Sequence, residues 1–182
     1  MFRRALRATF LAENQIGLVT GGGYVGLMGA VADAAIAAGG EVVGVIPRHL
    51  HQREIAYCGL TELHIVESMH ERKTRMSELA DGFIALPGGA GTPEEIFEQW
   101  TWAQLGLHPK PCALQNVGGY FDPLLLMLQG AVRQGFMRAE HATMPIVHDA
   151  IEPILDAFRA YAPPAQKWGP RTAIAEDFPS GA

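Results

Sequence analysis

A glycine-rich stretch over residues 83–95 has the residue types of an anion-binding loop. Its first four residues are apolar, which is typical of a short buried strand, and Gly88, Gly89 and Gly91 follow almost at once. We expect these glycines to take backbone angles that residues with a Cβ atom avoid. The loop opens into a helix, whose free N–H groups and partial positive charge favour a phosphate. The stretch therefore predicts a cradle for a phosphate group.

Thr92 and Pro93 mark the expected start of that helix. Proline suits the first helical position because its missing N–H would have no partner there, and a threonine before it can cap the helix. Helical spacing then continues over residues 94–105. Three of its residues are expected to face the core: Ile96, Trp100 and Ala103.

A second glycine-rich turn precedes an alanine-rich stretch near the start of the chain. Gly21, Gly23 and Gly26 fit the spacing Gly-x-Gly-x-x-Gly, and Glu41 closes a plausible strand–helix–strand interval. The turn is either a ligand loop or a tight turn with close helix packing, so a dinucleotide site stays open. No Gly-x-x-x-x-Gly-Lys-Ser/Thr motif is present, which disfavours phosphoryl transfer by a P-loop mechanism.

Short apolar runs alternate with helical spacing along the chain, and this alternation predicts a doubly wound α/β fold with a Rossmann-like parallel sheet. We expect one domain over residues 1–161 and a loose tail over 162–182, which is rich in proline and poor in apolar residues. The expected strands are 17–21, 41–47, 63–66, 83–86, 111–116 and 145–148. The expected helices are 2–14, an alanine-rich helix that follows the glycine-rich turn at 21 and stops at Gly39 and Gly40, a helix starting at 69, 94–105, 122–134 and 150–161.

Two helix starts carry a capping signature. Ser68 with Glu71 fits a capping box, and Met69, Met76 and Leu79 of that helix can face the core. Asp149 with Glu152 fits a second box before the last helix. Residues 48–61, in contrast, have few secondary-structure signals and are expected to form a polar loop.

Composition limits the classes of partner. The chain has 182 residues, 48% hydrophobic content and a net charge of -5, which indicates a globular protein with no general attraction to nucleic acid or anionic membranes. No apolar stretch approaches the roughly 18 residues of a membrane span. We therefore expect neither nucleic acid nor membrane as a partner.

The cysteines and histidines indicate no metal site. Cys58 and Cys112 are far apart and form no Cys-x-x-Cys motif, which fits a reducing compartment and a cytoplasmic location. His49 and His51 lack further ligands at metal-binding spacing, so we expect no metal and no cofactor.

Several motifs in order resemble the LONELY GUY family of cytokinin-activating phosphoribohydrolases, whose members have often been called lysine decarboxylases. The motifs cover most of residues 1 to about 160, and their joint occurrence is specific for the family. They are Gly21-Gly-Gly-Tyr-Val-Gly-Leu-Met-Gly, Gly44-Val-Ile-Pro-Arg, Ser68-Met-His-Glu-Arg-Lys, the stretch 83–95, Thr101-Trp-Ala-Gln-Leu-Gly and Asn116-Val-Gly-Gly-Tyr-Phe-Asp-Pro-Leu.

The resemblance implies hydrolysis of the N-glycosidic bond of an N6-modified adenosine 5′-monophosphate, which gives free base and ribose 5-phosphate. Two alternatives stay open: a general nucleosidase acting on AMP or other nucleoside monophosphates, and a non-catalytic protein that binds nucleotide or molybdenum cofactor. A pyridoxal phosphate decarboxylase is disfavoured because nothing in the chain resembles that cofactor's lysine site.

The family pattern also implies roles for individual residues. Arg72 and Glu95 match the catalytic pair, and Glu95 is expected in the first helical turn, where the helix dipole favours a carboxylate. Gly88 would shape the turn while Gly89, Ala90, Gly91 and Thr92 contact the nucleotide phosphate. The remaining substrate-binding residues implied are Glu54, Lys73, Pro93, Glu94 and Thr101.

Two further expectations concern assembly. The resemblance implies a homodimer, because family sites use residues at a subunit contact. The family also begins with a strand and a Cys-Gly-Ser-Ser-like loop, whereas this sequence begins within the following helix. We therefore expect the family's first strand to be lacking, with a free sheet edge and exposed apolar surface in its place.

Overall fold

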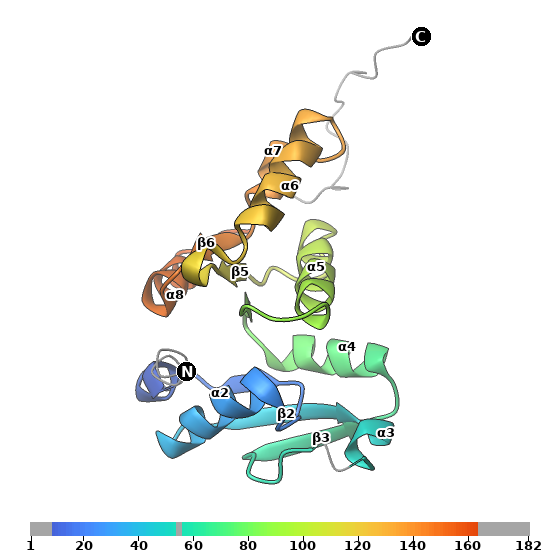
Figure 1. Cartoon of the computed structure of the whole chain (residues 1–182), viewed down its shortest axis with the longest axis vertical. Helices are drawn as coiled ribbons and strands as arrows, with labels where there is room; N and C mark the ends of the chain where they lie inside the picture. Colours follow the sequence, from blue (N-terminus) through green and yellow to red (C-terminus); the bar gives the residue numbers. More distant parts are fainter. Residues whose placement is uncertain (1–8, 54–55, 164–182) are drawn as a thin grey trace.

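The computed structural model describes residues 9–53 and 56–163, over which strands and helices alternate (Figure 1). Residues 9–13 are helical, and the rest of the helix expected from residue 2 lies outside the described residues. The strands are β1 (Leu18–Thr20), β2 (Val42–Pro47), β3 (Glu62–Val66), β4 (Phe83–Ala85), β5 (Cys112–Gln115) and β6 (Ile146–His148). The helices are α2 (Gly26–Ala37), α3 (Arg48–His51), α4 (Met69–Leu79), α5 (Gly91–Gln104), α6 (Asp122–Arg133), α7 (Ala139–Ala142) and α8 (Ile151–Arg159), with a 3₁₀ turn η1 (Val117–Gly119).

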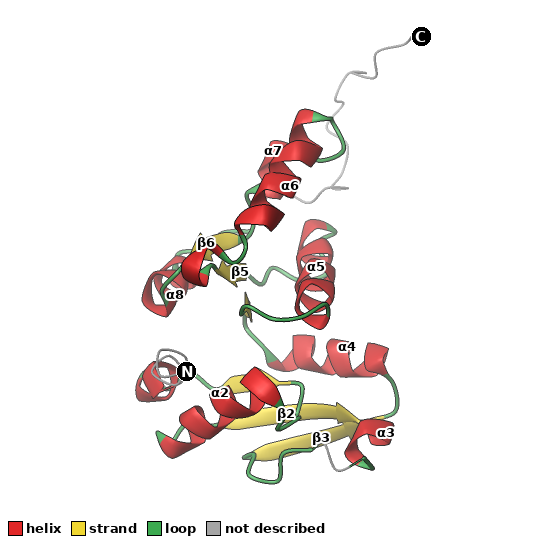
Figure 2. Ribbon diagram, in the orientation of Figure 1, coloured by secondary structure: helices red, strands yellow, loops and turns green. Residues whose placement is uncertain are grey.

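The strands pair in two parallel three-stranded sheets, β1-β2-β3 and β4-β5-β6 (Figure 2). Val19 lies opposite Val43 in the first sheet, and Ile84 lies opposite Ala113 in the second. The expectation of a Rossmann-like α/β fold with parallel strands is confirmed. The pairing is divided, however, so that β1 and β4 are each the edge strand of a separate sheet.

Two clusters of buried side chains pack the helices against the strands. The larger includes Ile96 and Trp100 of α5 with Leu114 of β5, and the smaller joins α2 to β2. Burial of a large apolar side chain contributes about 1.5–3 kcal/mol, so the core forms where the apolar faces of α5 and β5 meet. Ile96 and Trp100 face inward as the spacing predicts, and Ala103 is partly buried against the same cluster.

The predicted cap of α4 is present. Ser68 Oγ accepts a hydrogen bond of 3.1 Å from the N–H of Glu71, and Glu71 Oε2 accepts one of 2.8 Å from the N–H of Glu67. The face predicted for this helix is partly wrong, because Met69 is exposed while Arg72 and Lys73 are buried. Arg72 and Lys73 therefore point into the molecule, where they form ion pairs with carboxylates of α5.

Two other local predictions fail. Helix α8 begins at Ile151 with Ala150 at its N-cap and without a side-chain cap hydrogen bond, so Asp149 is not the N-cap residue that the expected capping box requires. Residues 48–61 are not wholly irregular, since Arg48–His51 forms one turn of helix. This turn follows Pro47, whose extended backbone ends β2.

Candidate active site

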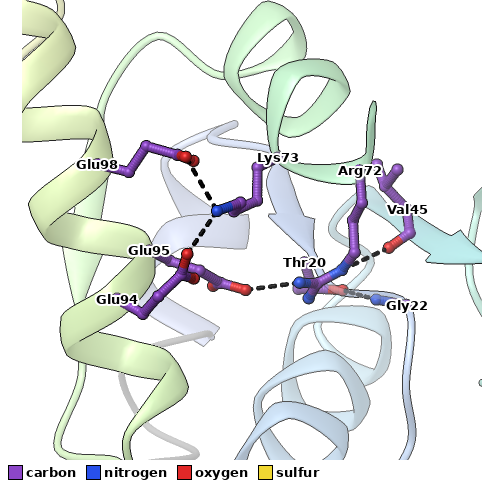
Figure 3. A network of polar contacts seen from close by, with 8 residues as sticks. All are labelled: Thr20, Gly22, Val45, Arg72, Lys73, Glu94, Glu95 and Glu98. Atoms are coloured by element: carbon purple, nitrogen blue, oxygen red, sulfur yellow. Dashed lines mark hydrogen bonds and ion pairs between the residues drawn. The ribbon is translucent and has the colours of Figure 1, made fainter. Parts of the chain in front are cut away.

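A cluster of charged side chains lies between α4 and α5 (Figure 3). Arg72 of α4 is only 8% exposed, and its guanidinium has two fixed acceptors. Nε donates to the carbonyl oxygen of Val45 at 3.1 Å, and Nη1 donates to Oε1 of Glu95 at 2.6 Å. A buried charge is stable only with such partners, so β2 and α5 together fix the position of this arginine.

Gly21 makes room for this guanidinium. It directly follows β1, and a Cβ atom built on it would lie 1.8 Å from Nη2 of Arg72. The neighbouring turn is held locally, since the N–H of Gly22 donates to Oγ1 of Thr20 at 3.3 Å. The first glycine-rich turn thus has a packing role against a charged side chain, which the sequence left open.

Lys73 forms the second ion-pair group of the cluster. Its Nζ donates to Oε1 of Glu94 at 2.5 Å and to Oε1 of Glu98 at 2.9 Å, although the lysine side chain is only 8% exposed. These hydrogen bonds, with Glu94 first, raise the pKa of Lys73 above its usual value and outweigh its burial. The lysine therefore stays an ammonium ion across the physiological pH range.

The glycine-rich loop after β4 differs from the prediction in its backbone. None of Gly88, Gly89 and Gly91 has a positive φ. A Cβ at Gly88 would lie 2.3 Å from Oγ1 of Thr92, whereas nothing lies within 4 Å of a Cβ at the other two positions. Close packing therefore requires a glycine at position 88, whereas Gly89 and Gly91 leave open space beside the backbone.

Helix α5 begins earlier than Thr92-Pro93 predicts. Its first residue is Gly91, and its N-cap is Ala90, which makes no side-chain cap hydrogen bond. Thr92 therefore lies inside the helix and is not its cap. Glu95 lies beyond the first turn, which contains Glu94 as its acidic residue. Because the dipole effect is confined to the first turn, Arg72 is the main partner of the Glu95 carboxylate.

A cavity of about 930 Å³ opens beside this loop. Its lining includes Gly21, Lys73, Gly88, Thr92 and Glu95. The Glu95 side chain is 36% exposed, so its carboxylate is accessible while it pairs with the buried arginine. The site lies where β1 and β4 end, as ligand sites of parallel α/β folds do.

The structure brings most of the predicted site residues together. Arg72 with Glu95, and Lys73 with Glu94, form direct ion pairs. Residues 88–93, which are Gly88, Gly89, Ala90, Gly91, Thr92 and Pro93, form the loop and first helical residues beside them. Thr101 is exposed further along α5, roughly 9 Å from Glu95 along the helix axis. Glu54 lies outside the described residues.

Three participants were not predicted. Glu98 is the second acceptor for Lys73, and its spacing four residues after Glu94 is a signal that it shares the same helix face. The hydroxyl of Tyr120 donates to the carbonyl oxygen of Gly88 at 2.5 Å and fixes the loop. The carbonyl of Val45 has no sequence signal, since any residue supplies that group.

The described residues contain no group of three or more His, Cys, Asp or Glu side chains that could hold a metal ion. Within the same part of the chain, no helix combines the length and apolar character needed to cross a membrane.

Fold and site together define a Rossmann-like α/β protein with a paired arginine and glutamate at the carboxyl ends of its strands. A family model described as "possible lysine decarboxylase" matches residues 28–158. The chain belongs to this family, and within it to the LONELY GUY proteins, as its relatives show.

Two relatives carry informative names. The chain is 50% identical over 151 residues to a cytokinin riboside 5′-monophosphate phosphoribohydrolase of Rhodococcoides fascians, a match that covers 82% of this chain and 76% of the relative. It is 43% identical over 163 residues to the probable cytokinin riboside 5′-monophosphate phosphoribohydrolase LOGL1 of Oryza sativa subsp. japonica, covering 90% of this chain and 73% of the relative.

Solved structures show the same fold. The molybdenum cofactor binding protein of Rippkaea orientalis superposes with a TM-score of 0.62 and 18% sequence identity, over 86% of each chain. At this identity the likeness concerns the fold alone.

Proposed function

We propose that this protein hydrolyses the N-glycosidic bond of cytokinin riboside 5′-monophosphate, an N6-modified AMP. Water would add to C1′ of the ribose as the bond to the base breaks, and the base would leave with a proton. The products are the free cytokinin base and ribose 5-phosphate. The observation that carries the proposal is the 2.6 Å pair of Arg72 and Glu95 beside the glycine loop, and the relatives' names support the substrate.

Glu95 is the proposed catalytic carboxylate. Cleavage of an N-glycosidic bond develops positive charge on the ribose, which a nearby carboxylate stabilises, and the same group can orient the attacking water. Its partial exposure to the cavity fits both tasks, because a substrate can reach it without breaking the core.

Arg72 is the proposed second member of the catalytic pair. Its planar fork is held by the Val45 carbonyl on one side and binds Glu95 on the other. The carboxylate is thereby oriented before substrate binds, which lowers the cost of reaching the reactive geometry.

The phosphate is proposed to bind backbone N–H groups at the start of α5. The cluster contains two cations and three carboxylates, so its side chains alone do not attract an anion. Free backbone N–H groups at the start of a helix attract anions. Gly89 and Gly91 leave space for a phosphate at the start of α5. Glu54, Lys73, Glu94 and Thr101 remain proposed substrate-binding residues.

We further propose a homodimer, a cytoplasmic location and a single domain over residues 1–161. Exposed apolar side chains support the dimer: Leu107 is 67% exposed just after α5, and Leu126 and Phe136 are 63% and 83% exposed on and after α6. A dimer contact over these side chains would remove their apolar surface from water. Light scattering coupled to gel filtration should give twice the chain mass, and the monomer mass would contradict the dimer.

The test of the activity uses two substrates. Purified protein is incubated with isopentenyladenosine 5′-monophosphate or with AMP, and released base and ribose 5-phosphate are quantified. We expect faster release from the N6-modified substrate. Equal release from both would replace the proposal with a general nucleosidase, and no release from either by folded protein would overturn the enzyme. Bound nucleotide recovered unchanged would then indicate a carrier.

A further inference from the structure

Residues 56–60 pack against the first glycine-rich turn of the chain. The N–H of Tyr57 donates to the carbonyl oxygen of Gly22 at 2.9 Å, and Gly23 and Ala56 form an isolated antiparallel bridge. Both contacts join backbone groups, so they hold the path of the main chain and do not depend on side-chain rotamers. The turn is therefore held by a segment that lies far from it in the sequence.

Strand β2 lies against both the turn and this segment. A Cβ atom at Gly44 of β2 would lie 2.8 Å from Cα of Gly22 and 2.3 Å from Cδ1 of Leu60. Gly22 has a φ of +73°, which favours glycine, and a Cβ there would lie 3.2 Å from Cβ of Ile46. Because the turn, β2 and residues 56–60 are in close contact, a shift of the segment would also shift the turn.

A side-chain hydrogen bond fastens residues 56–60 to helix α2. The hydroxyl of Tyr57 donates to Oδ1 of Asp33, and this hydrogen bond is the main cause that raises the pKa of the tyrosine. The hydroxyl therefore remains a donor at neutral pH. A Cβ at Gly59 would lie 2.7 Å from Cε1 of the same ring, so a glycine there makes room for the partly buried tyrosine.

The turn connects this hydrogen bond to the candidate active site. Gly21, the residue before Gly22, leaves space for Nη2 of Arg72. The same guanidinium donates from Nε to the carbonyl oxygen of Val45 (Figure 3). A Cβ at Gly22 would lie 3.3 Å from the backbone nitrogen of Val45. Arg72 thus contacts the turn and β2 close to the place where these two pack on each other.

From these contacts we infer that Tyr57 and Asp33 are positioning residues of the candidate site. Their hydrogen bond holds residues 56–60 against the turn, and the turn holds Gly21 beside Arg72. The guanidinium thereby keeps the direction in which it meets Glu95. Neither Tyr57 nor Asp33 is proposed to touch the substrate. The effect on catalysis rests on the proposed function, whereas the effect on Arg72 does not.

The direct test measures how fast the Nε–H proton of Arg72 exchanges with water, by nuclear magnetic resonance of isotope-labelled protein. A buried N–H that is bonded to a carbonyl is protected from exchange, and its protection falls when the surrounding structure loosens. Tyr57→Phe deletes only the hydroxyl, and Asp33→Ala deletes its acceptor. Asp33→Asn keeps an oxygen that can accept the hydrogen bond. Tyr161→Phe, which changes another partly buried tyrosine, is the matched control.

We expect exchange of the Arg72 proton to quicken about fivefold or more in Tyr57→Phe and in Asp33→Ala, and to stay near the wild-type rate in Asp33→Asn and Tyr161→Phe. The double variant should exchange no faster than either single variant, because both residues act through one hydrogen bond. Unchanged exchange in Tyr57→Phe, or additive effects in the double variant, would overturn the inference. If Asp33→Ala does not fold, the comparison of Tyr57→Phe with Tyr161→Phe decides the test.

The consequence for turnover is measured separately, as base release from isopentenyladenosine 5′-monophosphate. We expect kcat to fall about threefold to tenfold in Tyr57→Phe with KM little changed, because Arg72 orients the proposed catalytic carboxylate. Asp33→Asn should retain most of the activity that Asp33→Ala loses. Faster exchange at Arg72 with an unchanged kcat would overturn the role of the pair in catalysis. Absence of base release from the wild type would contradict the proposed function and not the positioning of Arg72.

Discussion

Arg72 and Glu95, 23 residues apart in the sequence, are joined by a 2.6 Å hydrogen bond from Nη1 to Oε1. The arginine is simultaneously held at 3.1 Å by the carbonyl of Val45. This arrangement leaves the glutamate as the more exposed member, with the arginine as its rigid support. The catalytic role proposed for Glu95 depends on this division of roles.

Gly21→Ala should impair activity without unfolding the protein. The new Cβ atom would occupy the position of Arg72 Nη2, while the glycine's own backbone has no positive φ to strain. We expect kcat/KM to fall by about tenfold to a hundredfold, because small misplacements of catalytic groups have effects of this size. Gly130→Ala in α6, where a Cβ atom has space, is the matched control. Equal activity of the two variants would show that Arg72 does not need its observed position.

Tyr120→Phe should weaken substrate binding more than turnover. The variant removes the hydrogen bond from the tyrosine hydroxyl to the Gly88 carbonyl and leaves the ring in place. Since one such bond contributes about 0.5–1.5 kcal/mol, we expect KM to rise about threefold to tenfold with kcat nearly unchanged. Tyr161→Phe, which changes a partly buried tyrosine close to Cys112, is the control. A fall in kcat with constant KM would contradict a role in holding the loop.

His108 should make the protein less stable in mild acid. Burial, and secondarily the charge of Lys110, lower the pKa of this histidine below its usual 6.5. The unfolded chain then takes up a proton that the folded chain does not, so stability is present above about pH 6.5 and falls as the pH drops through that value.

Urea unfolding of the wild type and His108→Gln at several pH values between 8 and 5 measures this effect. Nδ1 of His108 accepts a 3.2 Å hydrogen bond from the Lys110 N–H, and the glutamine oxygen can replace that acceptor. We expect the unfolding free energy of the variant to fall less steeply as the pH is lowered. The difference in slope corresponds to at most about one bound proton. Parallel curves would mean that His108 titrates alike in both states.

The two cysteines should differ in reactivity. Cys58 is exposed, whereas Cys112 is buried in β5 and its burial raises the pKa of the thiol to about 12. Because the thiolate is the reactive form, a thiol reagent at pH 8 should label only Cys58 in the native protein and both after denaturation. The Cys58→Ser variant should then show almost no native labelling. Rapid labelling of that variant would show that β5 opens readily.

Local sequence patterns predict much of the fold. Short apolar runs mark the strands, and Ser68 with Glu71 correctly marks the start of α4, because these signals depend on neighbouring residues. The division of the sheet has no such local signal, since strand pairing depends on distant segments, and the expectation of a free sheet edge came from the family pattern instead. The buried face of α4 was misjudged for the same reason: Glu94, Glu95 and Glu98 on another helix make burial of basic residues favourable.

The candidate site could be predicted only in part. Its Arg–Glu pair came from family motifs, and the structure places the two side chains in contact. The start of α5 was misplaced because Thr92-Pro93 is a common helix start, although Gly91 already has helical geometry here. Tyr120 and the Val45 carbonyl act through contacts across the fold, which spacing along the chain does not encode.

The most direct test of the central claim is the rate of base release from isopentenyladenosine 5′-monophosphate by Glu95→Gln, measured beside Glu78→Gln. Both changes neutralise a glutamate that pairs with an arginine, but Glu78 pairs with Arg75 on the surface of α4, with its side chain 57% exposed. We predict that Glu95→Gln loses about 10²-fold or more in kcat while it still binds the nucleotide, and that Glu78→Gln keeps wild-type activity. Base release by Glu95→Gln at the rate of Glu78→Gln would contradict the catalytic role of Glu95.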